Sequence, residues 1–414
     1  MYRYLESTKF VENKKLNQVV LSNAQNGTWI KLPVEWKKLV DRLVKYEGSY
    51  QNFLRLFESQ DDKVQFENLI NILSKKGFIT DCQEIKVNGI KSIYFALTER
   101  CNLRCKHCCY DAIPMSTQTD LQTKDMIKIL NIIADAHPDM IVLSGGEPLI
   151  REDFMELLLY LRECYSGKIT LSTNALLINE KNIRQLIKNI DHFAISLDGY
   201  NEESCALIRG KGIFESVIDK VRNLKELGAS EISLSMVQVD QDKKGVEKFK
   251  QLNSELGTKP VIRVLAPVGR ASNLLDGERY IRNVYKKSTI LDSDVNKLSD
   301  SCIACKCGGA SRDFLINYDG NVYPCGLMID EDYKMGNILE YNSMKEFLQV
   351  YKTTYGYHSF QEIMPENFSA CKECEVNVFC WHCLQELDQA KHHPELIPLR
   401  CSIRKENLYK LIWG

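Results

Sequence analysis

Short apolar runs alternate with amphipathic stretches through the middle of the chain. The runs have the length of buried strands, and the stretches between them carry apolar residues at three- and four-residue intervals, as helices do. The predicted strands are Ile93–Leu97, Met140–Leu143, Lys168–Leu171, His192–Leu197, Glu231–Met236 and Val261–Leu265. The predicted helices between them include Lys124–Ala136, Phe154–Cys164, Glu180–Lys188 and Phe214–Leu227. This alternation predicts an α/β fold, with a parallel sheet and helices outside it.

The two ends of the chain have different patterns. Residues 1–88 begin with strand-like pieces and continue with helical stretches. The strand-like pieces are Tyr2–Leu5, Lys9–Glu12 and Val19–Ser22, and the helical stretches are Pro33–Tyr46, Tyr50–Phe57 and Lys63–Lys76. After residue 300, Asp319-Gly320 separates two short apolar runs and predicts a strand–turn–strand unit. We therefore expect three domains, comprising residues 1–88, 89–300 and 301–414.

Three cysteines follow the first strand of the middle domain in a C-x3-C-x2-C spacing: Cys101, Cys105 and Cys108. Thiolates bind soft metals, and so short a loop can hold one corner of a [4Fe–4S] cluster through three sulfurs. One iron then has no protein ligand and is able to chelate a small molecule. Zinc is the alternative, but zinc sites usually use paired C-x2-C units. The spacing therefore favours a reactive iron–sulfur centre.

A second motif, Gly145-Gly146-Glu147-Pro148, follows the strand that begins at Met140. Two glycines allow the backbone to approach a ligand closely, and the carboxylate offers an acceptor for an ammonium group. A tight strand-to-helix turn would explain Gly-Gly alone. Together with the cysteine loop, however, the motif resembles the radical S-adenosylmethionine (radical SAM) superfamily.

This resemblance implies a partial (β/α)6 barrel with its site at the carboxyl ends of the strands. It also implies that the open iron binds the amino and carboxylate groups of S-adenosylmethionine beside Gly145, Gly146 and Glu147. Electron transfer from the reduced cluster would then give a 5′-deoxyadenosyl radical, which abstracts hydrogen. Cys101, Cys105 and Cys108 are the catalytic and metal-binding residues of this expectation.

Polar residues at later strand ends are further candidates for cofactor contacts. The resemblance implies ribose and methionine contacts for Ser172, Asn174 and Ser196, although turn and cap chemistry would equally explain each of them. The resemblance also implies that Arg209 binds the carboxylate of the methionine moiety. His107 lies where the family usually has an aromatic residue near adenine, and the sequence suggests packing for it. The segments around Arg263 and Pro267–Ala271 resemble the adenine-side edge.

Nine further cysteines lie in the last hundred or so residues. They are Cys302, Cys305, Cys307, Cys325, Cys371, Cys374, Cys380, Cys383 and Cys401. Metal ligation explains such a density better than disulfides in a reducing compartment. The spacings Gly320-x4-Cys325 and Cys371-x2-Cys374-x5-Cys380 resemble the SPASM extension, which holds two auxiliary [4Fe–4S] clusters. Two residues, Trp381 and His382, separate Cys380 from Cys383. The family usually has three residues at this point, before the fourth cysteine of the run.

The SPASM resemblance implies ligands for both auxiliary clusters, and therefore three [4Fe–4S] clusters in the chain. Cys371, Cys374, Cys380 and Cys401 would hold the outer cluster. Cys307, Cys325 and Cys383 would hold the inner one. Cys305 or Cys302 would provide the fourth inner ligand, or else an iron would be open to a substrate thiolate.

Composition and charge narrow the function further. The 414 residues carry a net charge of −1, which favours neither nucleic acid nor a membrane surface as a partner. The N-terminus lacks the apolar stretch of a signal peptide, and no run reaches the length of a membrane span. Sixteen cysteines then fit metal ligation in the cytoplasm.

The order of elements in residues 1–88 resembles the RiPP recognition element, a winged-helix domain that captures a leader peptide by β-strand addition. The resemblance implies a peptide paired with an open strand edge near residues 9–22. A cap that merely stabilises the barrel is the alternative.

Together these resemblances predict a radical SAM maturase of ribosomally made peptides. The predicted reaction is hydrogen abstraction from a precursor peptide, followed by a thioether crosslink from a cysteine sulfur to carbon. Carbon–carbon crosslinking and an oxidation like that of anaerobic sulfatase maturases are the alternatives, although Gly326 stands where the latter have an aspartate base. A non-catalytic iron–sulfur carrier or peptide scaffold is a further alternative. We expect an electron donor such as flavodoxin or ferredoxin. No general base can be assigned, since Asp313, Asp319 and Glu362 merely lie in or near the SPASM extension in the sequence.

Overall fold

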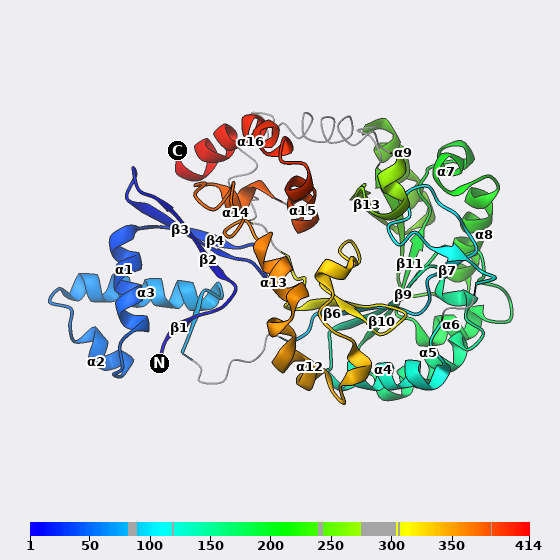
Figure 1. Ribbon diagram of the computed structural model, residues 1–414, viewed down its shortest axis with the longest axis horizontal. Helices are drawn as coiled ribbons and strands as arrows, with labels where there is room; N and C mark the ends of the chain where they lie inside the picture. Colours follow the sequence, from blue (N-terminus) through cyan, green and yellow to red (C-terminus); the bar gives the residue numbers. More distant parts are fainter. Residues whose placement is uncertain (82–88, 118–119, 239–242, 275–303, 305–306, 382) are drawn as a thin grey trace. The chain divides into compact units, whose positions relative to one another are not determined.

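The computed structural model describes residues 1–81, 89–117, 120–238, 243–274, 304, 307–381 and 383–414 (Figure 1). These residues form two compact units. The first gathers the described residues up to 81, Ala304, Cys307, Gly308 and Gln361–Gly414, and the second gathers those from Gly89 to 274 and Gly309–Phe360. The three domains predicted from the sequence, with boundaries at residues 88 and 300, stay a prediction. The two compact units group the chain differently, since the first unit contains residues from both ends of the chain.

The second unit is built on an eight-stranded sheet, in which six neighbouring parallel strands follow the order of the chain. They are β6 (Ser92–Ala96), β9 (Met140–Ser144), β10 (Lys168–Thr173), β11 (His192–Ser196), β12 (Ile232–Gln238) and β13 (Lys259–Val264). Neighbouring strands pair in parallel throughout, for example Leu143 with Leu171 and Ile195 with Leu234. The predicted α/β fold with a parallel sheet is therefore confirmed, and the carboxyl ends of these strands share one edge.

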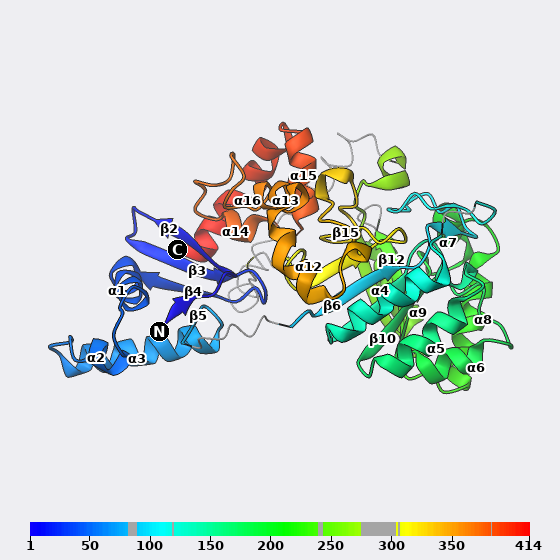
Figure 2. The same ribbon diagram turned by 60° about the horizontal axis from the view of Figure 1, so that its bottom comes forward.

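Helices cover the outer side of this sheet (Figure 2). They are α4 (Thr123–Asp135), α5 (Phe154–Cys164), α6 (Ile183–Asn189), α7 (Glu202–Arg209), α8 (Ile213–Glu226) and α9 (Lys243–Leu256). Apolar residues at helical spacing explain their packing, since α4 buries Met126, Ile129, Leu130 and Ile133 along one face. The predicted helices at 124–136, 154–164 and 214–227 agree with the observed ones within about a residue.

A hairpin from the C-terminal region continues the same sheet beyond β6. Strand β14 (Asp313–Ile316) pairs in parallel with β6, and β15 (Val322–Tyr323) pairs antiparallel with β14. Gly320 makes the turn at φ +84°, a conformation that favours glycine. The strand–turn–strand prediction is thus confirmed, whereas its place beside β6 could not be read from local sequence. The helices that follow are η3 (Glu331–Tyr333), η4 (Ile338–Glu340), α12 (Met344–Val350), η5 (Tyr351–Thr353) and α13 (Tyr355–Glu362).

The first unit contains a three-stranded antiparallel sheet in the order β2 (Thr8–Asn13), β3 (Gln18–Asn23), β4 (Trp29–Pro33). Strand β1 (Arg3–Tyr4), which precedes this sheet in the chain, pairs antiparallel with β5 (Ile79–Thr80) to form a separate two-stranded sheet. Three helices follow: α1 (Val34–Val44), α2 (Tyr50–Leu54) and α3 (Gln60–Lys75). The sequence pattern did not predict strand β4, because this strand has only five residues and leads directly into α1, which begins at Val34.

The two faces of this sheet have different neighbours. Val19, Leu21 and Leu32 point to one face and join a core with residues of α1, α2 and α3. The other face meets the C-terminal helices α14 (Asn377–Cys380) and α16 (Leu396–Trp413), while α15 (Leu384–His392) lies between them in sequence (Figure 1). The contacts on this face are Lys9 with Glu366 at 2.7 Å, Asn13 with Tyr409 at 2.9 Å, Lys31 with the Ile412 carbonyl at 2.9 Å, and the rings of Trp29 and Phe379 at 5.3 Å.

Replacing Phe66 with alanine tests the core of the first unit. Phe66 is fully buried and packs its ring against Trp36, Phe53 and Phe57, so we expect Phe66→Ala to lower the free energy of unfolding by about 3–5 kcal/mol. All four tryptophans of the chain lie in this unit, and their fluorescence during denaturant unfolding therefore reports on it. Leu56→Ala, at a side chain that is 56% exposed, should change the midpoint little. Equal midpoints for the two variants would contradict this packing.

Candidate functional site

The predicted cluster loop lies between β6 and α4, at the carboxyl edge of the barrel sheet. Cys101 ends the short strand β7 (Arg100–Cys101), which pairs with β8 (Ile113–Pro114). The Leu103 amide donates to the Cys101 sulfur at 3.4 Å, and the Lys106 amide donates to the Ile208 carbonyl at 3.0 Å. Backbone bonds therefore hold both halves of the loop.

The three thiols of this loop converge. Burial, together with the nearby thiols of Cys105 and Cys108, raises the pKa of Cys101 to about 11. Burial also raises the pKa of Cys105. Three mutually close sulfurs, of which that of Cys105 is buried and those of Cys101 and Cys108 are partly exposed, suit iron, which binds thiolate. The donor set thus fits the cluster that the motif implies.

Gly145 and Gly146 bring the end of β9 against the beginning of the loop. The Gly146 amide donates to the Thr98 carbonyl at 2.7 Å, and the Glu147 amide donates to the Arg100 carbonyl at 2.8 Å. A Cβ on Gly145 would lie 2.3 Å from the Thr98 carbonyl oxygen, and one on Gly146 would lie 2.2 Å from that of Arg100. Only glycine fits at either position. The sequence suggested a close approach to a ligand, and the structure shows a close approach to the loop backbone.

Glu147 is completely buried and organises the end of β10. Its carboxylate accepts from the Thr173 hydroxyl at 2.7 Å and from the Asn174 amide at 2.8 Å. Burial raises the pKa of Glu147 to about 7 despite these hydrogen bonds. Asn174 in turn donates to the side chain of Asn102 at 2.8 Å, within the cysteine loop. The predicted residues Glu147 and Asn174 therefore link two strand ends to the loop.

A further arginine, which the sequence did not single out as a loop contact, braces the loop from the segment after β13. Arg270, in η2 (Gly269–Leu274), donates through Nε to the Cys105 carbonyl at 3.0 Å and through Nη1 to that of Ala112 at 2.8 Å. Its amide donates to the Cys108 carbonyl at 2.9 Å. The resemblance placed this segment beside adenine. The contacts of Arg270 with carbonyl oxygens of the loop could be recognised only from the folded structure.

Three buried polar side chains meet behind Cys105. Asp198 follows β11 in the left-handed conformation, with φ +59°. Its Oδ2 atom lies 2.8 Å from Nε2 of His107 and 2.7 Å from Nε of Arg209. The guanidinium of Arg209 holds the pKa of Asp198 far below its usual range against the effect of burial. The packing role expected for His107 thus includes a polar contact with the Asp198 carboxylate.

Side chains on the concave side of the sheet alternate with buried neighbours. Ser172 and Ser196 are partly exposed between fully buried residues of β10 and β11, and Tyr94 of β6 is 44% exposed between Ile93 and Phe95. Burial raises the pKa of Tyr94, with Arg263 and Cys325 close enough to affect it. Ser172 and Ser196 therefore line the barrel interior; contact with a cofactor stays a prediction.

The four predicted outer-cluster cysteines come together in the first unit. Burial raises the pKa of Cys371 to about 12, and Cys380, Cys374 and Cys401 are close enough to contribute to this rise. Arg400 places its guanidinium 4.2 Å from the centre of the Trp381 ring and donates to the Cys380 carbonyl. In the described part of the chain no three Cys, His, Asp or Glu side chains enclose a single metal ion. A four-iron cluster does not require that, since each iron takes its own thiolate.

The predicted inner-cluster cysteines are distributed between the units. Cys307 and Cys383 belong to the first unit, and Cys325 belongs to the second. Their joint ligation of a cluster stays a prediction. The alternative ligands Cys302 and Cys305 lie outside the described residues.

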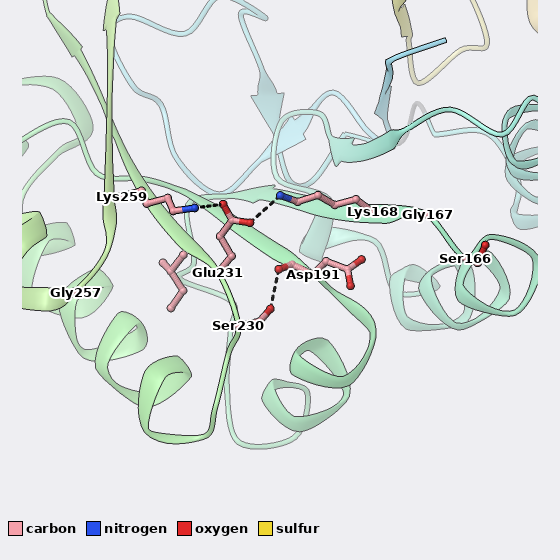
Figure 3. Close-up of a pocket in the computed structure, with 9 residues that line it drawn as sticks. Ser166, Gly167, Lys168, Asp191, Ser230, Glu231, Gly257 and Lys259 are labelled. Atoms are coloured by element: carbon pink, nitrogen blue, oxygen red, sulfur yellow. Dashed lines mark hydrogen bonds and ion pairs between the residues drawn. The ribbon is translucent and has the colours of Figure 1, made fainter. Parts of the chain in front are cut away.

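A surface pocket lies at the opposite, amino-terminal edge of the barrel sheet (Figure 3). Its charged lining is a bridge in which Glu231 accepts from Lys168 at 2.7 Å and from Lys259 at 2.8 Å. These lysines begin β10 and β13, whereas the cysteine loop lies at the carboxyl ends. The pocket is therefore distinct from the candidate site. No helix of the described residues is long and apolar enough to cross a membrane.

Comparison with known proteins agrees with the geometry of the cysteine loop. The model of the radical SAM superfamily matches residues 95–251, and that of the SPASM iron–sulfur cluster-binding domain matches residues 307–375. These matches and the barrel define an enzyme that uses iron–sulfur chemistry and S-adenosylmethionine. The mycofactocin maturase MftC of Mycolicibacterium smegmatis is 30% identical over 301 residues, which cover 67% of this chain and 74% of the relative. The chain belongs to the radical SAM/SPASM peptide maturases.

Solved structures show the same fold at low sequence identity. Streptococcus suis SuiB bound to the precursor peptide SuiA matches with a TM-score of 0.56 and 18% identity, covering 94% of this chain and 97% of SuiB. The structure of anSMEcpe with bound AdoMet matches with a TM-score of 0.51 and 18% identity, covering 76% of this chain and all of that one. The partial-barrel prediction is thereby confirmed.

Replacing Gly146 with alanine tests the contact between β9 and the cysteine loop. The added methyl group must displace the Arg100 carbonyl, and overpacking of this kind costs about 1–3 kcal/mol. We expect Gly146→Ala to lose the loop cluster, measured as iron per chain and as the electron paramagnetic resonance (EPR) signal that responds to S-adenosylmethionine. Gly89→Ala is the matched control, since its Cβ would meet nothing within 4 Å. Normal iron content in Gly146→Ala would contradict the proposed contact.

Proposed function

We propose that the protein modifies a ribosomally made precursor peptide, forming a thioether between a cysteine sulfur and a carbon of the peptide. The observation that carries this proposal is the convergence of three thiols, one buried and two partly exposed, at the carboxyl edge of the barrel, where Gly146 and Arg270 brace their loop. When bound there, a cluster with S-adenosylmethionine supplies a 5′-deoxyadenosyl radical for hydrogen abstraction. The partly exposed side chains of Tyr94, Ser172 and Ser196 would face the reacting molecule.

Three [4Fe–4S] clusters form part of the proposal. Cys101, Cys105 and Cys108 would hold the first. The outer thiols Cys371, Cys374, Cys380 and Cys401 would hold the second. Cys307, Cys325 and Cys383, with Cys302 or Cys305, would hold the third. Thioether formation removes two hydrogens from the peptide, one from carbon as a hydrogen atom and one from the thiol as a proton, and leaves one electron. The cysteines of the auxiliary sites would hold clusters able to accept that electron.

The first unit would hold the leader peptide by strand addition. The predicted range 9–22 contains the edge strand β2 and part of the central strand β3. Among the described residues β3 is paired on both sides, whereas β2 is paired with β3 alone, so we assign the peptide strand to β2. The precursor peptide of SuiB supports a peptide as the kind of partner. A cytoplasmic flavodoxin or ferredoxin would supply the electrons.

Cleavage of S-adenosylmethionine tests the enzymatic part of the proposal. We expect the anaerobically reconstituted protein to form 5′-deoxyadenosine when dithionite is added, as measured by liquid chromatography and mass spectrometry. Cys105→Ser should lower the yield at least about a hundredfold, because the cluster loses one of its three ligands. Cys164→Ser is the matched control, since Cys164 lies exposed on α5. A fully reconstituted wild type that forms no 5′-deoxyadenosine would be a carrier or scaffold.

The mass of the modified peptide tests the bond type. We expect a precursor peptide encoded beside this gene to lose two hydrogens on coexpression, with one cysteine protected from alkylation. A peptide coexpressed with the Cys105→Ser variant should keep the mass of the unmodified peptide, and all its cysteines should react with the alkylating agent. A peptide two hydrogens lighter with all its thiols still alkylated would contradict the thioether and indicate a carbon–carbon bond.

A further inference from the structure

The buried ion pair behind the cysteine loop contains the only arginine that contacts a loop sulfur among the described residues. Nη1 of Arg209 donates to Sγ of Cys105 at 3.7 Å. The side chains of Arg209 and Asp198 are only 8% and 1% exposed. A buried cation beside a sulfur ligand acts in a medium of low dielectric constant, where charge interactions are strong.

Asp198 determines how Arg209 is oriented. Both Nε and Nη2 of Arg209 bind Oδ2 of Asp198, at 2.7 and 2.6 Å. His107 approaches the same oxygen at 2.8 Å, and the Val237 amide donates to Oδ1 at 2.6 Å. The Nε–Nη2 edge of the guanidinium, one of its two edges that can take a carboxylate through two parallel bonds, is therefore occupied. Nη1 faces the loop.

We propose that Arg209 is a positioning residue for the cluster, locked by Asp198 so that it donates to the Cys105 sulfur and raises the reduction potential of the loop cluster. A donor and a positive charge at a cluster sulfur stabilise the reduced form, which carries one more negative charge. This proposal rests on the proposed cluster at Cys101, Cys105 and Cys108. It differs from the resemblance, which implies that Arg209 binds the methionine carboxylate of S-adenosylmethionine.

The two roles predict different measurements on the full-length protein with all clusters reconstituted. We expect Arg209→Gln to shift the midpoint potential of the loop cluster to more negative values in the absence of S-adenosylmethionine. An EPR-monitored redox titration measures it, using the signal that S-adenosylmethionine perturbs. The Kd of S-adenosylmethionine should change by less than about threefold. Loss of a carboxylate partner would instead weaken binding at least about tenfold and leave the potential of the ligand-free cluster unchanged.

Arg270→Gln is the matched control. Arg270 also braces the loop, from a partly buried position with its side chain 13% exposed, but it contacts the carbonyl oxygen of Cys105 and not the sulfur. We expect its potential to stay near that of the wild type. An equal shift in both variants would show that any disturbance of the loop moves the potential, and it would overturn the proposal.

Two more variants keep the test decisive if Arg209→Gln fails to retain the cluster. Arg209→Lys keeps the charge but cannot bind Asp198 through a fork, and Asp198→Asn keeps the arginine but weakens its anchor. We expect both to shift the potential in the same direction as Arg209→Gln. Wild-type potentials in both would overturn the proposal. Failure of the wild type to cleave S-adenosylmethionine would contradict the proposed function while leaving these potentials interpretable.

Discussion

The contact between two backbone segments, Gly145-Gly146 and Thr98–Arg100, is the constraint on which the site depends. It joins the end of β9 to the start of the cysteine loop by amide-to-carbonyl bonds of 2.7 and 2.8 Å. Neither side can move apart without losing these bonds, and neither glycine can carry a side chain. The loop therefore begins at a fixed point on the sheet, and the positions of Cys101, Cys105 and Cys108 follow from it.

Two buried carboxylates extend this constraint in different ways. Glu147 is surrounded by neutral donors, and burial raises its pKa to about 7. Asp198 lies beside a buried guanidinium, which keeps its pKa far below the usual range. Equal burial thus gives opposite protonation behaviour, and the neighbouring charge decides the sign. Glu147 ties strand ends together through neutral hydrogen bonds, whereas Asp198 holds a cation beside a sulfur.

Local sequence predicted the elements of the barrel well, because each strand and helix carries its own periodicity. The strand that begins at Met140 and the helix at Phe154–Cys164 are examples, since apolar spacing alone located both. The cysteine loop and Gly145-Gly146 were also recognisable from their spacing. Strand β4 was not, because five residues before a helix leave little alternation to detect.

Contacts between distant segments were beyond sequence reasoning. Arg270 braces a loop more than 150 residues earlier in the chain, and β14 joins β6 although they are separated by more than 200 residues. Nothing in the neighbourhood of either segment specifies its partner. The pairing of Asp198 with Arg209 likewise depends on how α7 follows β11. Pairings of this kind are fixed by tertiary packing.

The sheet of the first unit has a consequence for how the chain is made. One face is covered by helices that follow it directly, but the other face, with Val11 and Val20 buried at 6% and 0% exposure, is covered from beyond residue 361. During synthesis this face and its two valines have no native cover until residues beyond 361 have left the ribosome. The nascent N-terminal region therefore exposes residues that are buried in the folded unit, a situation in which chaperone engagement is expected.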